Sequence, residues 1–317
     1  MASVAACGDA GDTDMDGLPE AVVAWEGATV FTTPDAPPVE DAVLVVVDGV
    51  VEAVGPRGSV QIPQAARRRN ALGLSVVPGL WNADVRLDDE LSEIIRDGED
   101  IDLALALEDR FTRYGITTVV FTEADPEELA ELRRRVAEEG LPSPRLLGPD
   151  DMPSSVRRAH GPDLGLWESE DPDDLLLGLA LDEAALVPGL SRMARWREGE
   201  FAEEVDARVE AALAALLRYV DAGGVVVLGT GAGWIQDWDP SSELLMMEDA
   251  GLTFEEILSA ATFQPSLRMP RGSDGEIEPG AGADLLFVEG DPSSDLSSLS
   301  RVREVLVGGF SVHEAGG

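Results

Sequence analysis

Two charged residues, Asp84 and Arg86, lie two positions apart in the segment V-V-P-G-L-W-N-A-D-V-R-L-D-D, which spans residues 76–89. An apolar run enters the Pro-Gly pair and the residues after it alternate, which predicts a β-strand. Residues i and i+2 of a strand face the same side, so we expect the acid and the base to lie together. A carboxylate can bind a cation, but a guanidinium cannot, because it has no lone pair to donate.

The elements around this segment change in type along the chain. Alternating apolar residues typical of strands fill both chain ends, and strands alternate with helical patterns between them. This alternation favours a parallel sheet or barrel in the middle, and the two β-rich ends can pair with each other. We expect an acidic tether, a composite β-sandwich and a β/α domain: residues 1–20, residues 21–77 with 272–317, and residues 78–271.

Turn and capping residues predict several boundaries. Asp48-Gly49 and Gly308-Gly309 each predict a β-hairpin, since these residues tolerate the positive φ that tight hairpin turns require. Asp125 followed by Pro126 predicts a helix start. The pattern Thr253-x-x-Glu256 predicts a capping box at the start of another helix.

Two longer segments are interpreted from periodicity and composition. Residues 90–114 have a helical pattern that ends at Gly115, and we expect one helix there. Residues 149–172 are rich in Pro, Gly and charge, which predicts a loop.

The charge balance of the chain is strongly acidic. The 317 residues include 62 acidic side chains and 23 basic ones, and the net charge is −39. All the basic residues are Arg, because the sequence contains no Lys. This charge disfavours nucleic acids and anionic membranes as partners. It is typical of a salt-tolerant, halophile-like surface, and the alternative is a site for cationic ligands.

The single cysteine, Cys7, follows Val4-Ala5-Ala6, which is similar to the lipidation box of bacterial lipoproteins. A polar Gly/Asp stretch follows, but only six residues precede the cysteine, so the usual hydrophobic segment is missing. We expect an extracytoplasmic, lipid-anchored protein whose only membrane contact is the anchor. The alternative is an ordinary disordered N-terminus on a cytoplasmic protein of a halophile.

An acidic pattern after Cys7 is similar to the start of a calcium loop. Carboxylates at alternate positions before a glycine suit a hard cation. An EF-hand would place Glu at the twelfth position, where this chain has Val23, so the loop would be a shorter type. The alternative is a flexible acidic linker. The calcium ligands expected here are Asp12, Asp14, Asp16 and Glu20.

Taken together, the segments resemble the amidohydrolase superfamily, in particular its imidazolonepropionase-like branch. The resemblance covers about residues 21–145 and 184–313 and rests on V-V-V-D-G-V-V-E-A-V-G-P, V-V-P-G-L-W-N-A-D-V-R-L, G-I-T-T-V-V, V-V-V-L-G-T-G-A-G, A-G-L-T-F-E-E-I-L-S-A-A-T, E-I-E-P-G-A-G-A-D-L-L-F-V-E-G-D-P and V-R-E-V-L-V-G-G-F-S-V. It implies a TIM-like (β/α) barrel beside a β-sandwich made from both chain ends. It also implies metal-dependent hydrolysis, often of C–N bonds, in which the metal activates water and a carboxylate moves the proton.

The sequence departs from this family where its metal should bind. Asp84 and Arg86 stand where the family has His-x-His, and Gly231 stands where it has an aspartate. The chain has no lysine to bridge two metals, and its two histidines are His160 and His313. The middle domain is also shorter than the roughly 250 residues of a typical barrel, so we expect a shortened and incomplete one.

The expected ligand pocket lies at the mouth of the barrel. We expect Arg86 to occupy the space of the metal and to pair with Asp84 or another carboxylate; the alternative is that Arg86 binds a ligand carboxylate. The loop after the last strand supplies aromatic and acidic side chains for a cationic or sugar-like ligand, or else packs over a closed mouth. The loop candidates are Trp234, Asp237, Trp238 and Asp239.

Three functions follow from these readings. The first is an inactive amidohydrolase with no cofactor in the barrel, which binds a small molecule or assembles with itself or with an active relative. The second is an active hydrolase of C–N bonds, with a single cation held by Asp84, Asp237 and Asp239. The third is a structural envelope protein anchored at Cys7.

Overall fold

The computed structural model describes residues 22–160, 164–169, 172–195, 202–269 and 274–316. It is a mixed α/β structure, as expected, with several sheets and helices along the chain. Cys7, Asp12, Asp14, Asp16 and Glu20 lie outside the described residues.

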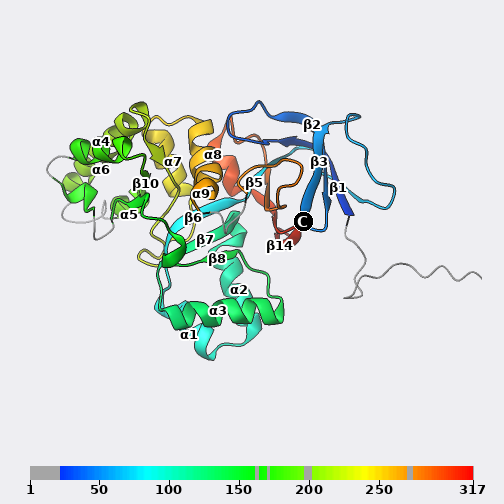
Figure 1. Ribbon diagram of the computed structural model, residues 1–317, viewed down its shortest axis with the longest axis horizontal. Coiled ribbons are helices and arrows are strands. Elements are labelled where there is room, and N and C mark those ends of the chain that lie inside the picture. The colour runs from blue at the N-terminus through cyan, green and yellow to red at the C-terminus, as the bar shows by residue number, and fades with distance from the viewer. Residues whose placement is uncertain (1–21, 161–163, 170–171, 196–201, 270–273, 317) are drawn as a thin grey trace, which may run out of the picture.

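The largest sheet combines strands from both chain ends (Figure 1). Its eight strands follow the order β14-β13-β12-β5-β1-β2-β3, with β4 beside β1. The join is the antiparallel pair β5–β12, in which Val76 lies opposite Phe287. The strands are β1 Val22–Val30, β2 Val39–Val47, β3 Val50–Pro56, β4 Arg67–Asn70, β5 Leu74–Pro78, β12 Leu285–Glu289, β13 Val302–Val307 and β14 Phe310–Glu314.

Both predicted hairpins are present in this sheet. Asp48 and Gly49 have φ angles of 47° and 79°, and they connect the antiparallel strands β2 and β3. Gly308-Gly309 connects β13 and β14 in the same way. The two turns touch each other, since a Cβ on Gly49 would lie 2.2 Å from the Gly308 carbonyl oxygen. Only glycine allows this close approach.

The middle of the chain forms two parallel three-stranded sheets, β6-β7-β8 and β11-β10-β9. The residues after β11 join them, because the Ala83 amide donates to the Leu228 carbonyl at 2.8 Å and the Arg86 amide donates to the Ala232 carbonyl at 2.8 Å. The strands are β6 Leu80–Arg86, β7 Ile116–Glu123, β8 Arg145–Leu147, β9 Val156–Arg158, β10 Ala185–Val187 and β11 Val225–Val226.

These six strands enclose a common apolar cluster. Trp81, Val120, Leu147, Val156 and Val187 contribute to it from five of the strands, and all are buried. Side chains from both three-stranded sheets therefore pack against one another. The strands of the described segments do not close into an eight-stranded ring, so a TIM-like barrel remains a prediction.

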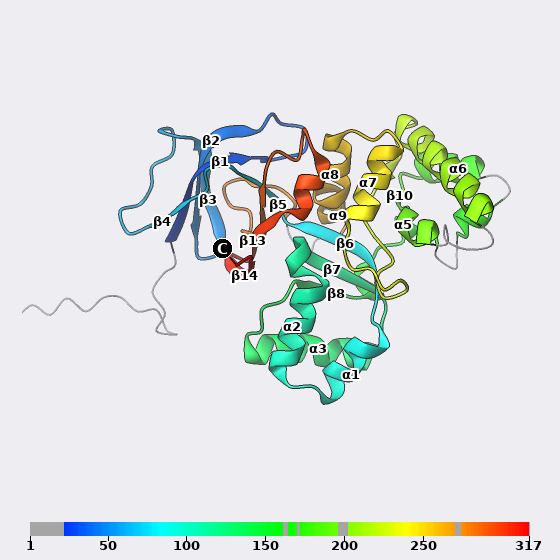
Figure 2. The same ribbon diagram turned by 180° about the vertical axis from the view of Figure 1, so that it is seen from behind.

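Helices lie on both sides of these sheets (Figures 1 and 2). Helices α1, α2 and α3 lie below β6, β7 and β8 in both views, while α5 and α6 lie to one side near β10, together with α4. The helices are α1 Asp89–Asp97, α2 Asp100–Arg110, α3 Pro126–Glu139, α4 Pro172–Leu181, α5 Leu190–Ala194, α6 Ala202–Asp221, α7 Ser241–Asp249, α8 Phe254–Ala261 and α9 Phe263–Arg268. Short 3-10 turns are η1 Thr112–Tyr114, η2 Pro149–Asp151, η3 Leu166–Glu168 and η5 Leu296–Ser300.

The sequence predicted some of these boundaries and missed others. Asp125 caps α3 and the Thr253–Glu256 capping box starts α8, as predicted. The single helix expected over residues 90–114 is wrong, because Gly98 is extended and separates α1 from α2. The loop expected over residues 149–172 is also wrong, since it contains β9 and η3.

One ion pair connects the β8 edge to the composite sheet. Arg145 donates from Nε and Nη2 to the two carboxylate oxygens of Asp284, at 2.6 and 3.0 Å. Asp284 directly precedes β12 and also accepts from the Gly308 amide at 2.6 Å. This buried carboxylate therefore connects the two parts of the chain, and the pairing raises the pKa of Arg145.

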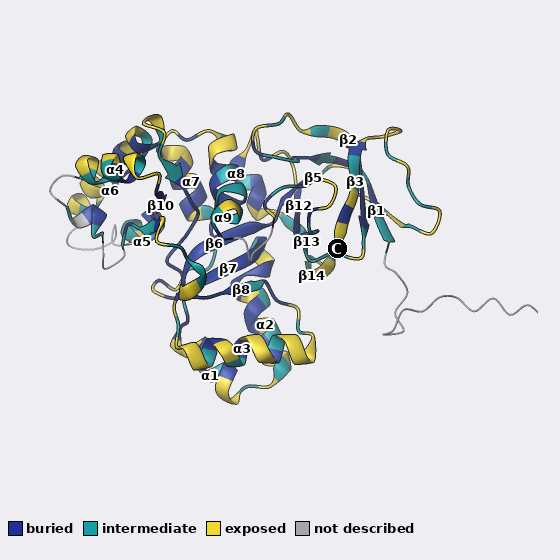
Figure 3. Cartoon of the chain, in the orientation of Figure 1, coloured by how far each residue is buried: buried dark blue, intermediate teal, exposed yellow. Residues whose placement is uncertain are grey.

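Buried residues form a continuous band through the sheets, and exposed positions lie on the outer helix faces (Figure 3). The largest cluster joins α1, α2, β7, α6 and α8, and a second one lies on the composite sheet around Trp25 and Phe287. None of the helices in the described ranges is long and apolar enough to cross a bilayer.

Candidate functional site at the end of strand β6

Asp84 is buried near the C-terminal end of β6, and its carboxylate already has partners. Oδ1 accepts from the Thr122 hydroxyl at 2.7 Å and from Arg158 Nη1 at 3.1 Å. Arg158 also donates to the Thr122 oxygen at 3.0 Å, which closes a three-membered network. The Asp84 side chain is 3% exposed and the Arg158 side chain 18%, so the ion pair lies inside the protein.

Arg158 ends β9, in a segment where the sequence predicted a loop. It reaches across from β9 to β6 and lies 3.9 Å from Glu123 of β7 as well. The strand is only three residues long, and Val156 is the one residue in it whose burial could have indicated a core strand. A sequence pattern this short could not have identified Arg158 as a site residue.

Arg86 does not pair with Asp84, which corrects the expectation from strand alternation. Its guanidinium carbon lies 4.8 Å from the ring centre of Trp234 instead. The pairing of β6 with β7 shifts register between Asn82 and Val85 and again at Arg86. The β6–β7 ladder is thus irregular at the place where the alternation argument assumed a regular strand.

The loop after β11 is fastened to β6. Asn82 donates to the Thr230 hydroxyl at 2.9 Å and accepts from the Thr230 amide at 3.1 Å. The Gly231 amide donates to the Asp84 carbonyl at 2.9 Å. Because these contacts use buried groups on both sides, they hold the loop in a fixed position beside Asp84.

Gly231 has φ of +69°, and a Cβ there would lie 2.9 Å from Cδ of Arg192. Arg192 is on α5, and its side chain thus occupies the space in which a side chain at position 231 would begin. Its guanidinium carbon lies 4.7 Å from the ring centre of Trp234. Trp234, with 39% of its surface exposed, is therefore contacted by two arginines, Arg86 and Arg192.

The other loop candidates lie elsewhere. Trp238 packs edge-on against Phe111, and the Arg110 guanidinium lies over its ring. Asp237 accepts from the Asp239 amide at 3.2 Å, and Asp239 accepts from the Ser241 amide at 2.8 Å, so both carboxylates brace the entry to α7. Asp237 also lines a cavity of about 450 Å³ between this loop, α5 and α7.

Glu243, an acid that follows the loop candidates in the sequence, is buried. It lies in the first turn of α7, where an acid is unremarkable, yet its exposed surface is 0%. Its carboxylate accepts from the Leu190 amide, the Ser191 amide and the Ser191 hydroxyl at 2.8, 2.7 and 2.6 Å. Burial, with a smaller contribution from nearby Asp84, raises the pKa of Glu243 to about 7 against the lowering effect of these donors.

The two histidines have structural partners. Nε2 of His160 lies 2.9 Å from the Gly189 carbonyl oxygen, just before α5. His313 is on β14, and its Nδ1 lies 2.7 Å from a carboxylate oxygen of Glu108. The geometry assigns neither ring a part in the Asp84 network.

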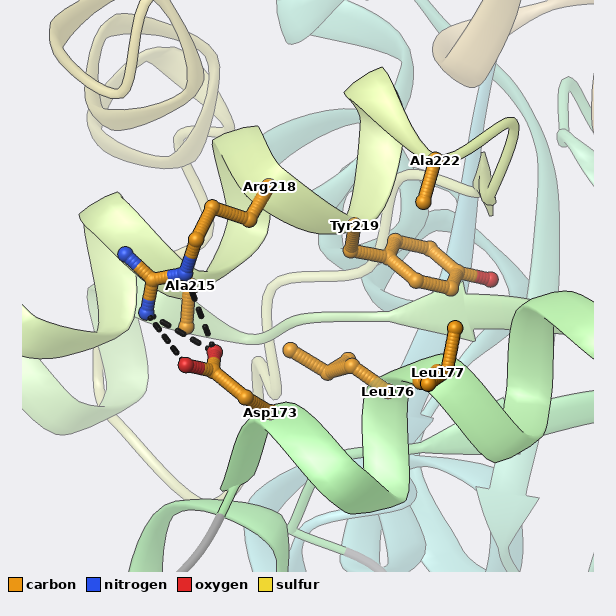
Figure 4. Close-up of a pocket in the computed structure, with 7 residues that line it drawn as sticks. All are labelled: Asp173, Leu176, Leu177, Ala215, Arg218, Tyr219 and Ala222. Carbon is orange, nitrogen blue, oxygen red and sulfur yellow. Dashed lines mark hydrogen bonds and ion pairs between the residues drawn. The ribbon is translucent and has the colours of Figure 1, made fainter.

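A separate cavity of about 190 Å³ lies between α4 and α6 (Figure 4). Asp173 and Arg218 close one side of it with a two-pronged ion pair, and Leu176 and Tyr219 form its apolar wall. The Tyr219 hydroxyl donates to the Ala184 carbonyl at 2.7 Å, and burial raises its pKa to about 12. These side chains are occupied by structural contacts.

Comparisons by sequence gave no match, because no protein-family model and no curated protein matches the chain. Solved structures match it over almost its full length. A protein assigned as a prolidase from Bifidobacterium longum gives a TM-score of 0.72 at 19% identity, covering 92% of this chain and 94% of its own. A Xaa-Pro dipeptidase with methionine bound in its active site gives 0.71 at 13% identity, covering 93% and 100%.

The ochratoxinase of A. niger gives a TM-score of 0.67 at 15% identity, covering 94% of this chain and 96% of its own. The chain has the amidohydrolase fold. The resemblance predicted from the sequence is thereby confirmed at the level of fold.

The amidohydrolase resemblance places metal ligands at positions 84, 86 and 231, and the side chains there do not make a donor set for a divalent cation. Asp84 is held by Arg158 and Thr122, Arg86 is a cation, and Gly231 has no side chain. Within the described ranges, no group of three or more His, Cys, Asp or Glu residues is placed to hold a metal ion. These residues therefore support no metal-dependent step.

Proposed function

We propose that this protein is a non-hydrolytic amidohydrolase relative, which retains the fold and a small-molecule pocket but not the metal chemistry. The ion pair between Asp84 and Arg158 carries the proposal. A guanidinium is permanently charged, so Arg158 neutralises the one carboxylate that remains at the expected metal position. Arg158 thus takes the electrostatic place of the metal.

The energetics of burial support this assignment. A divalent cation on Asp84 would have to displace Arg158, whose Nη1 is 3.1 Å away, or share the site with it. Two like charges a few ångströms apart repel strongly where water is excluded. Moving Arg158 away would leave a partly buried guanidinium without its main partner, which is itself costly.

A hydrolysis assay tests the proposal. The purified chain, supplied with zinc, manganese or iron, is assayed on dipeptides, N-acyl amino acids and cyclic amides. We expect rates no higher than those of an Asp84→Asn variant, which keeps the side-chain volume but removes the charge. Asp97→Asn, an exposed change on α1, is the matched control.

Turnover that is abolished by a chelator and by Asp84→Asn, but kept by Asp97→Asn, would overturn the proposal. It would instead support an active hydrolase of C–N bonds with a cation held by carboxylates.

A protein without its own chemistry can still serve as a non-catalytic subunit. We propose assembly with itself or with an active amidohydrolase, and co-purification from the native host followed by mass measurement of the intact complex tests this. Recovery of the chain as a monomer alone would contradict the assembly and leave the ligand-binding role unaffected.

A further inference from the structure

We propose that Arg86, Trp234 and Arg192 form a binding site for the carboxylate of a small organic anion. The two guanidinium carbons lie 4.8 and 4.7 Å from the same ring centre, although Arg86 ends β6 and Arg192 lies on α5. The fold therefore brings two positive charges from distant segments onto one aromatic side chain. A negative charge bound near this ring would reduce the repulsion between the arginines.

The protein itself does not supply that charge. In the part of the chain that the structure describes, neither Arg86 nor Arg192 forms an ion pair or a side-chain hydrogen bond, and the guanidinium of each lies near the Trp234 ring. Other arginines do find acids in this strongly acidic chain, as Arg145 does with Asp284. Two arginines left with free donors beside a fixed loop are available to a ligand.

The site is both accessible and held in position. Trp234 has 39% of its surface exposed, so the stack faces solvent. The loop that carries it is bonded to β6 through Thr230 and Gly231, and Gly233 has φ of +86° where a Cβ would lie 2.2 Å from the Arg86 carbonyl oxygen. A site whose side chains are already held in place loses little freedom on binding.

A neighbouring cavity can receive the rest of the ligand. The cavity of about 450 Å³ is lined by Ser191 and Ala194, which flank Arg192 on α5, and by Ile235, which follows Trp234. Met246 of α7 adds a further apolar surface. Arg195, Asp237 and Ser242 complete the lining, so the cavity is of mixed polarity. A ligand with a carboxylate head can place a short apolar body against Ala194, Ile235 and Met246.

The charge distribution favours a monoanion over phosphate. Asp237, which lines the neighbouring cavity, repels a second negative charge, and the whole chain carries −39. A planar carboxylate also matches the fork of one guanidinium with two parallel bonds. The earlier expectation of a cationic ligand for this loop is therefore replaced by an anionic one at Trp234.

This inference rests on the proposed function, since it takes the mouth as a ligand site. Titration calorimetry at fixed ionic strength compares hexanoate, inorganic phosphate and hexylamine as probes. We expect hexanoate to bind, phosphate to bind more weakly and hexylamine not to bind. Arg86→Gln and Arg192→Gln should each weaken hexanoate about tenfold or more, as expected for loss of a charge-assisted bond.

Two further variants separate recognition from folding. Arg192→Lys keeps the charge but loses the fork, so it should bind between wild type and Arg192→Gln. Arg113→Gln, which removes an arginine lying over the Tyr114 ring outside the site, should bind hexanoate like wild type. Circular dichroism of each variant shows whether it is folded.

Equal hexanoate binding by wild type and by a folded Arg86→Gln/Arg192→Gln double variant would overturn the inference, and so would tighter binding of phosphate than of hexanoate. Failure of the proposed function is distinguishable: chelator-sensitive hydrolysis with intact hexanoate binding would overturn the function and leave the anion site in place.

Discussion

Nη1 of Arg158 lies 3.1 Å from Oδ1 of Asp84, so a side chain from β9 neutralises a buried carboxylate on β6. Thr122 of β7 bonds to both partners and completes the network. Three strands of the two parallel sheets thus meet at one charge pair. The pair both joins the sheets and offsets the charge at the position where the family resemblance expects a metal ligand.

Arg158→Gln should destabilise the protein by about 3 kcal/mol, because it leaves Asp84 buried without its cation. Denaturant unfolding followed by circular dichroism measures the change. A double-mutant cycle with Asp84→Asn should show that the two losses are not additive, since each change removes the same interaction.

The exposed pair Arg218–Asp173 is the control for this cycle. Both side chains are more than half exposed, so Arg218→Gln should cost less than about 1 kcal/mol. If Arg158→Gln lowered the free energy of unfolding no more than Arg218→Gln does, the buried pair would not stabilise the protein more than an exposed pair. The account of the site would then be wrong.

Gly231→Ala should destabilise the protein by about 2 kcal/mol, through strain at φ of +69° and through contact with Arg192. Gly58→Ala shares the strain, since its φ is +88°, but a Cβ there meets nothing within 4 Å. The difference between the two variants in thermal or denaturant unfolding measures the Arg192 contact. Equal losses would mean that Arg192 does not occupy the space beside residue 231.

Asp284→Ala should weaken the connection between β8 and the composite sheet. The free energy of unfolding should fall by about 2 kcal/mol, which is less than for a fully buried pair. The reason is that Arg145 is 35% exposed, so water can solvate its guanidinium once Asp284 is removed. Asp109→Ala, which breaks an exposed pair with Arg113, should change stability by no more than about 0.5 kcal/mol. Unfolding that is equally affected by both variants would argue against the connection.

Glu243 makes stability depend on pH. Its pKa is raised to about 7 in the folded protein, whereas an unfolded glutamate titrates near 4.5. Between pH 4.5 and 7 the Glu243 carboxyl is protonated in the folded protein and ionised in the unfolded chain. The stabilisation that this difference gives is fully present below pH 4.5 and is lost as pH rises through 7. The loss in the free energy of unfolding should be about 3 kcal/mol.

Glu243→Gln should remove this slope, since the amide does not titrate. Glu248→Gln, an exposed change on the same helix α7, should leave it as in wild type. The measurement is the difference in denaturant unfolding between wild type and each variant across pH 4.5 to 8. A wild-type minus Glu243→Gln difference that does not change with pH would contradict the account.

Local signals in the sequence predicted the parts of the fold that depend on local physics. The hairpin turns at Asp48-Gly49 and Gly308-Gly309, the Asp125 cap and the Thr253 capping box all depend on residues within a few positions of each other. The pairing of the two β-rich ends was also predicted, because long alternating strands need partners.

The site was only partly predictable, because it depends on contacts between distant segments. Asp84 and Arg86 were identified, but the irregular pairing of β6 with β7 cannot be read from alternation. Arg158 lies on a three-residue strand and Arg192 on a five-residue helix, and both are too short for a periodic signal. Arg192 gains its role only because the fold places it beside Gly231 and Trp234.

Metal stoichiometry after equilibrium dialysis tests the central claim most directly. The full chain and its Asp84→Asn and Asp97→Asn variants are dialysed against zinc, and bound metal is measured by elemental analysis. With Arg158 as the cation on Asp84, the wild type should retain no more zinc than Asp84→Asn. One zinc per chain in the wild type and in Asp97→Asn, lost in Asp84→Asn, would contradict the account.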